Sequence, residues 1–95
     1  MILLPEAEAD LAAARDWYER QHTGLGVEFL NRVGDTFRRI GLAPLMFASI
    51  HRGVRRAFVH RFPYIAYFRL VDDEPVILGV LHTRRDSEAW RSRIG

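Results

Sequence analysis

The periodicity of the apolar residues changes once along the chain, near Pro44, and this change limits the folds open to it. Before Pro44 the apolar side chains recur at the spacing of amphipathic helices. After Pro44 they form short runs rich in β-branched and aromatic residues, separated by turn-forming residues, which indicates strands. A chain of 95 residues has room for one core. We therefore expect a single α+β domain over residues 1–95, with the helices before most of the strands.

The first expected helix covers residues 6–21 and follows a short strand at residues 2–4. Pro5 suits the start of a helix, because its missing N–H group would have no partner there. Acidic residues in the first turns favour the same assignment, since the helix dipole is positive at that end. The apolar stripe of this helix comprises Ala7, Leu11, Ala14 and Tyr18.

The second expected helix covers residues 25–40. Gly41 follows it as a C-terminal cap, and Pro44 prevents its continuation. Because the loop between the two helices is short, they should form an antiparallel hairpin. The apolar stripe expected to face the core comprises Val27, Leu30, Val33, Phe37 and Ile40.

An antiparallel meander is expected after Pro44, with strands at residues 46–50, 54–60, 64–71 and 76–83. The last strand is nearly all apolar, so it should be central and buried on both faces. Asp86 is expected to cap a short C-terminal helix that carries Trp90. The resulting order is β-α-α-β-β-β, a helical hairpin packed on a small antiparallel sheet. The predicted core contains Leu11, Tyr18, Leu30, Val33, Phe37, Phe58, Ile65, Ile77 and Val80.

The net charge of +2 is unevenly distributed. Residues 1–37 carry three Arg and seven acidic residues, a balance of −4, whereas residues 38–95 carry eleven Arg and five acidic residues, a balance of +6. All 14 basic residues are Arg. Because the guanidinium fork suits phosphates and carboxylates, the second half is expected to meet a polyanion or an acidic protein.

Several classes of site have no signal in the sequence. There is no cysteine, and no His, Asp or Glu group has metal-ligand spacing, so neither a metal site nor a cofactor is expected. No phosphate-binding glycine loop or nucleophile motif is present. No apolar run is long enough to span a bilayer, and the first residues do not resemble a signal peptide. We expect a cytoplasmic protein with no membrane partner.

The order of short motifs along the chain resembles the RelE/ParE toxin superfamily, and in particular its ParE-like, or plasmid-stabilisation, branch. Each motif alone is common, but their order and spacing together are specific. The resemblance covers nearly the whole chain. The matching pieces are Pro5-Glu6-Ala7-Glu8, Trp17-Tyr18-Glu19, Leu25-Gly26, Phe29-Leu30, Pro44, Val54-Arg55-Arg56, Arg61-Phe62-Pro63-Tyr64, Val80-Leu81-His82, Arg84-Arg85-Asp86 and Trp90.

The resemblance implies a bacterial toxin that is neutralised in a complex with a cognate antitoxin. ParE-like members poison DNA gyrase, and RelE-like members cleave mRNA on the ribosome; fold alone does not choose between them. RelE-like nucleases commonly use Lys as well as Arg, and this chain has no Lys. The first hypothesis is therefore a gyrase poison without chemistry of its own. The alternatives are an mRNA endonuclease and a non-toxic remnant that only binds its antitoxin.

Two sets of residues follow from the first two hypotheses. Target contact by a gyrase poison is assigned to Arg84, Arg85, Trp90 and Arg91. A nuclease would instead place Arg55, Arg56, Arg61, His82 and Arg84 around the scissile phosphate, with His82 as acid or base. Because successive strand residues face opposite sides, Arg55 and Arg56 should diverge. Trp90 either anchors the C-terminal segment on the sheet or contacts a partner.

Overall fold

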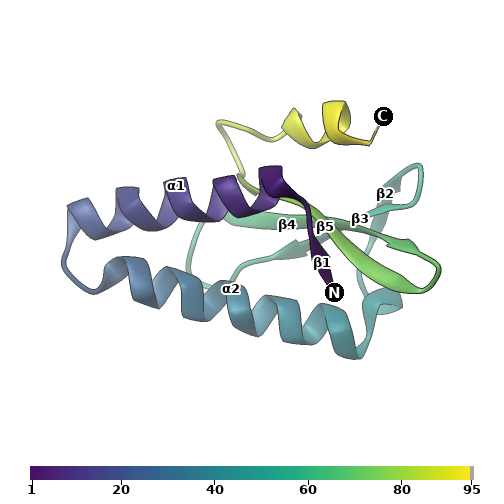
Figure 1. Cartoon of the computed structure of the whole chain (residues 1–95), viewed down its shortest axis with the longest axis horizontal. Helices are drawn as coiled ribbons and strands as arrows, with labels where there is room; N and C mark the ends of the chain where they lie inside the picture. The colour runs from purple at the N-terminus through teal and green to yellow at the C-terminus, as the bar shows by residue number, and fades with distance from the viewer. Residues whose placement is uncertain (95) are drawn as a thin grey trace.

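The computed structural model describes residues 1–94 and has two helices, a five-stranded sheet and two short 3₁₀ helices (Figure 1). The strand order is β1-β5-β4-β3-β2. This arrangement confirms the expected α+β fold, with the helical hairpin on one face of the sheet. The elements are β1 (Ile2–Leu3), α1 (Pro5–Gln21), α2 (Leu25–Leu42), η1 (Pro44–Met46), β2 (Ser49–His51), β3 (Val54–Phe58), β4 (Tyr64–Val71), β5 (Glu74–His82) and η2 (Ala89–Arg93).

The hairpin of α1 and α2 depends on a tight turn around Gly24. Gly24 has a φ of 91°, a left-handed conformation. Glycine adopts it without strain because it has no Cβ atom, whereas most other residues would be strained there. The carboxylate of Glu19 accepts hydrogen bonds from the backbone N–H groups of Gly24 and Gly26, at 3.0 to 3.1 Å. It thereby satisfies donors at the start of α2 that have no partner within the helix.

The central position of β5 was predicted from its apolar sequence and is confirmed, because it lies between β1 and β4. Strands β2 to β5 form the expected antiparallel meander. The chain has one strand more than the expected order, β-α-α-β-β-β-β, and the sheet is mixed rather than wholly antiparallel, since β1 pairs with β5 in parallel, with Ile2 opposite Val76 and Leu3 opposite Ile77. Within residues 1–94, no helix combines the length and the apolar character that crossing a bilayer requires.

The larger core lies between the helices and the sheet. Phe29, in the second turn of α2, is fully buried there, and its ring contacts those of Tyr18, Phe62 and Tyr64 at centroid distances of 5.1 to 5.3 Å. The predicted core residues Val33, Ile65, Ile77 and Val80 are buried, and Leu11, Tyr18, Leu30 and Phe37 are partly buried against this core.

A smaller core lies on the opposite face of the sheet. It is covered by the segment that contains η2 rather than by the hairpin, and Figure 1 shows η2 on the other side of the sheet from α2. Tyr64 and Tyr67 point to opposite faces, as their spacing predicts, and both are buried. The buried members of this core are Val54, Ile65, Tyr67, Leu78, Leu81 and Trp90.

Several details of the sequence prediction are wrong. Gly41 does not cap α2, because the helix continues through it to Leu42 and its C-cap is Ala43. Phe58 is 58% exposed, because β3 ends there and the residue is outside both clusters of buried side chains. Val27 is 61% exposed, and Phe29 takes its place in the buried stripe of α2. Residues 46–48 are not a strand, since Pro44 starts the 3₁₀ turn η1. The C-terminal segment is a 3₁₀ helix without a side-chain cap, and Asp86 contributes only its backbone carbonyl to it.

Candidate functional site

The C-terminal segment crosses the second face of the sheet and is anchored there by Trp90. Trp90 is 3% exposed and stacks on Tyr67, with 5.6 Å between ring centroids and 21° between ring planes. The guanidinium of Arg91 lies 4.9 Å from the Trp90 ring centroid and also pairs with Glu88 at 2.5 Å. Of the two roles considered for Trp90, the geometry matches anchoring, while the Arg91 head faces solvent.

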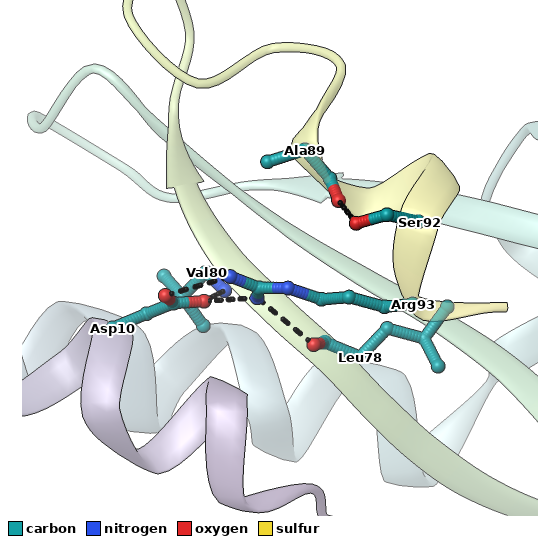
Figure 2. Close-up of polar contacts among 6 residues, drawn as sticks. All are labelled: Asp10, Leu78, Val80, Ala89, Ser92 and Arg93. Atoms are coloured by element: carbon teal, nitrogen blue, oxygen red, sulfur yellow. Dashed lines mark hydrogen bonds and ion pairs between the residues drawn. The ribbon is translucent and has the colours of Figure 1, made fainter.

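An ion pair between Asp10 and Arg93 holds the same segment to the edge of the sheet (Figure 2). Because β1 has only two residues, the next backbone groups of β5 along this edge have no strand partner. Asp10 accepts from the N–H of Val80 at 3.0 Å, and Arg93 donates to the C=O of Leu78 at 3.1 Å. The two side chains pair with each other at 2.6 Å, and this hydrogen bond raises the pKa of Arg93.

Gly79 makes this arrangement possible, since a Cβ atom at that position would overlap the Arg93 guanidinium. Sequence reasoning missed the pair and assigned Asp10 only a role at the start of α1. A signal was present, because Asp10 lies between Ala7 and Ala14 on the buried stripe of α1. Three elements from distant parts of the chain therefore meet at this edge: α1, β5 and η2.

His82 organises the turn after β5. Its Nδ1 atom accepts hydrogen bonds from the backbone N–H groups of Arg84 and Arg85, at 3.1 and 3.3 Å. Since Nδ1 is an acceptor, the proton of the neutral imidazole is on Nε2. The ring also packs edge-on against Tyr64, with 5.3 Å between centroids. His82 therefore shapes the turn that carries the two arginines.

Arg85 extends from this turn over the start of β4 and donates a hydrogen bond to the Tyr64 hydroxyl at 3.1 Å. Burial raises the pKa of Tyr64, and the Arg85 charge opposes that rise. Arg85 and Tyr64 line a cleft of about 310 Å³ between α1 and the turn after β5. Trp17, which is 42% exposed, and Arg20 line the α1 side of this cleft.

The structure separates the five residues considered for a nuclease. Arg55 lies on the helix face and donates to the Phe47 carbonyl at 2.6 Å, whereas Arg56 lies on the opposite face, with its guanidinium 5.5 Å from the Phe58 ring centroid. Their divergence is as predicted from strand alternation. Arg61, with a φ of 71°, lies in the β3–β4 turn beside α2.

Arg61, His82 and Arg84 lie at one end of the sheet, where the N–H of Thr83 donates to the carbonyl of Pro63 at 2.9 Å. Arg55 and Arg56 pair with residues in the middle of β4, away from that end. The four residues assigned to target contact are nearer to one another in the sequence than the five nuclease candidates are. They lie in the turn after β5 and in η2. Within residues 1–94, no three His, Asp or Glu side chains gather as a metal site would require.

A groove of about 310 Å³ runs beside η2 on the second face. Arg56 and Arg91 supply positive charge to its lining, and the largely buried rings of Tyr67 and Trp90 form part of its wall. Glu88 also lines it and is paired with Arg91. The C-terminal half of the chain thus combines Arg and aromatic side chains in two places, the groove and the cleft beside Arg85.

Comparisons with known proteins assign the chain to a family. Residues 1–87 match the ParE toxin of the type II toxin–antitoxin system parDE. The chain belongs to the ParE toxin family. This ParE-family chain is therefore a toxin of the type II class, and η2 lies just beyond the matched residues.

A solved structure supports the same assignment. The chain resembles a chain of the chromosomal ParDE toxin–antitoxin system from P. aeruginosa, with a TM-score of 0.75 and 25% sequence identity. The similarity covers 86% of this chain and 95% of the other. No curated protein sequence matches this one. The resemblance suggested by the sequence motifs is thus confirmed at the level of the family and the fold.

Proposed function

We propose that this chain is a cytoplasmic toxin that poisons DNA gyrase without chemistry of its own and is neutralised by a cognate antitoxin. The observation that carries the proposal is its membership of the ParE family over residues 1–87. The similarity to a solved structure supports an antitoxin as the partner, because that structure is described as a ParDE toxin–antitoxin system.

The arrangement of the arginines favours binding over catalysis. A nuclease needs cationic groups and an acid or base around one phosphate. Here Arg55 and Arg56 point to opposite faces, and the Nδ1 atom of His82 is occupied by two backbone N–H groups. Neither feature suits a shared reaction centre.

Target contact is assigned to Arg84, Arg85 and Arg91, with Trp90 holding the segment in place. Arg84 and Arg85 follow His82 in an exposed turn, and Arg91 lies on η2. In this proposal Trp90 acts through Arg91, since its ring is buried against Tyr67. The sequence assigned target contact to these three arginines and also to Trp90.

The test adds purified, antitoxin-free protein to DNA gyrase with relaxed and supercoiled plasmid. We expect loss of supercoiling and trapped double-strand breaks. A triple variant, Arg84→Glu, Arg85→Glu and Arg91→Glu, should require at least about tenfold more protein, a difference of about 1.4 kcal/mol in binding. The matched control reverses three arginines elsewhere, Arg15→Glu, Arg32→Glu and Arg69→Glu. Equal potency of the two variants would contradict the placement of target contact, and no effect of the wild-type protein would contradict the target itself.

One observation favours a second candidate, ribosome-dependent mRNA cleavage. The groove beside η2 has both Arg56 and Arg91 in its lining, and two guanidinium groups suit the phosphates of a nucleic acid. The sequence-based version of this candidate uses Arg55, Arg56, Arg61, His82 and Arg84. It is tested by mRNA cleavage on translating ribosomes, where His82→Ala should lower cleavage while the protein stays folded.

A further inference from the structure

Three large apolar side chains lie together in solvent at the end of α2 and in η1. Leu42 is 85% exposed, Leu45 is 70% exposed and Met46 is 83% exposed. Isolated exposed apolar residues are ordinary, but a contiguous group marks an interaction surface. We call these three residues the apolar patch. Leu42 and Met46, with Ala43, Phe47 and Arg39, line a hollow of about 390 Å³.

The stretch of sequence that carries the apolar patch is rich in arginine and has no acidic residue. No acidic residue occurs from residue 36 to residue 71, a stretch of 36 residues that contains seven arginines. These are Arg38, Arg39, Arg52, Arg55, Arg56, Arg61 and Arg69. The segment that carries the apolar patch is therefore positively charged along the sequence, and of its arginines Arg39 lines the hollow.

Arg39 lines the hollow, Arg55 bonds to the lining residue Phe47, and both arginines have only neutral partners. Arg39 donates to Thr36 Oγ1 and to the Phe58 carbonyl, both at 3.3 Å, and its guanidinium lies 5.9 Å from the Phe47 ring centroid. Arg55 donates to the Phe47 carbonyl at 2.6 Å. Among residues 1–94, neither makes an ion pair with a carboxylate. Each is therefore a fixed positive charge without a counter-charge beside an apolar surface.

We infer that the apolar patch anchors the antitoxin through an amphipathic segment with an apolar stripe flanked by carboxylates. Side chains spaced along a helix at three and four residues fill such a hollow, and flanking carboxylates match Arg39 and Arg55. A nucleic acid would satisfy the arginines but would leave Leu42, Leu45 and Met46 exposed. An acidic protein segment fits both features of the surface. This inference rests on the proposed neutralisation by an antitoxin.

The anchor lies apart from the residues assigned to target contact. Figure 1 shows α2 and η1 on the opposite side of the sheet from η2, which carries Arg91. A segment held at the apolar patch therefore leaves the Arg84 to Arg91 region uncovered unless the antitoxin continues around the sheet. Changes at the patch should consequently release the toxin from its antitoxin while leaving its toxicity intact.

The experiment uses the full chain and, as probe, the protein encoded by the open reading frame adjoining its gene. The test variant is Leu42→Ser, Leu45→Ser and Met46→Ser. The matched control is Val27→Ser and Val71→Ser, which replaces exposed apolar residues elsewhere. Because all five positions are exposed, both variants should fold, and circular dichroism with thermal melting checks this. We expect the patch variant to bind the probe at least tenfold more weakly, and the control to bind like the wild type.

The outcomes separate the inference from the proposed function. Equal binding by the wild type, control and patch variant overturns the anchor but retains the antitoxin. Absence of binding by the wild type itself overturns the proposed neutralisation, and the anchor with it. If the patch variant binds the probe like the wild type but binds duplex DNA more weakly than the wild type, the patch contacts DNA. That result overturns the inference that a protein segment docks there. In cells, co-production of the probe should rescue growth with the control and fail with the patch variant.

Discussion

The two faces of the sheet are covered in different ways. The helix face is covered by two long helices, and its core includes fully buried large residues such as Phe29 and Phe68. The second face is covered by a five-residue 3₁₀ helix, anchored by Trp90 and by the Asp10–Arg93 pair. One face therefore provides most of the buried surface that stabilises the fold, whereas the other presents a short segment on a few contacts.

This difference matches the proposed division of roles. The helix face is stabilised by many contacts, so the fold remains stable although Leu42 and Met46 at its end are exposed. The antitoxin is inferred to dock at these residues. A short segment on few contacts has a low free energy of local opening, which is usual for elements that engage ligands. The Asp10–Arg93 pair links the two layers, since Asp10 belongs to α1 and Arg93 to η2.

The largest expected effect compares one aromatic residue from each face. Phe29→Ala should lower the free energy of unfolding by about 3 to 5 kcal/mol, because it leaves a cavity inside a closed core. Trp90→Ala should lower it by only about 2 kcal/mol, because the short segment can detach instead of enclosing a cavity. Urea denaturation measures both values. Hydrogen exchange should show that Trp90→Ala speeds exchange mainly in residues 86–94; an equal loss for both variants would contradict the comparison.

An intermediate effect is expected from the link between the layers. Asp10→Ala leaves the Val80 N–H and the largely buried Arg93 without their partner, and should cost about 1.5 to 3 kcal/mol. A matched control is Asp16→Ala, which removes an exposed pair with Arg15 and should cost less than about 1 kcal/mol.

Asp10→Ala and Arg93→Ala, with the variant that carries both changes, form a double-mutant cycle. If the pair links the layers, the double variant should be less destabilised than the sum of the two single variants. Additive losses, within error, would show that Asp10 and Arg93 act independently.

The smallest expected effect concerns pH. Burial raises the pKa values of Tyr18 and Tyr64 on the helix face and of Tyr67 on the second face. The folded protein thus holds these protons more tightly than the unfolded chain, whose tyrosines ionise near pH 10.0. Their contribution to stability is complete below that pH and is lost as pH rises through the raised pKa values.

Unfolding free energies at about pH 8 and about pH 11 measure this loss. Tyr67→Phe should make the decrease smaller, because one buried ionisable group is removed. Tyr64→Phe should do the same but also lose the hydrogen bond from Arg85 at both pH values. A pH dependence that neither variant changes would exclude the buried tyrosines as its cause.

Much of the fold was predictable because its helices and strands have clear local patterns. The stripe of α2, the antiparallel meander and the central place of β5 follow from apolar spacing and run length. Phe58 shows the limit of this reasoning: it alternates correctly within β3, yet no element covers it. Burial depends on what packs over a position, which alternation does not specify.

The candidate site was less predictable than the fold. The sequence identified Arg84, Arg85, Trp90 and Arg91 as a group, and their placement in one turn and one short helix follows from their proximity along the chain. It did not distinguish their roles, because the burial of Trp90 depends on Tyr67 from another strand. The apolar patch was missed for a similar reason, since exposed and buried leucines at a helix end have the same local pattern.

The sequence alone determined the helix-to-strand order, the opposite orientations of Arg55 and Arg56, and the positive charge of the second half. These properties depend on neighbours along the chain. Only the tertiary structure decided that Asp10 meets Arg93 across 83 positions, that Trp90 is enclosed, and that Leu42 and Met46 are not. The physical reason is that burial and pairing between distant residues depend on how whole elements pack, and that information is absent from any local pattern.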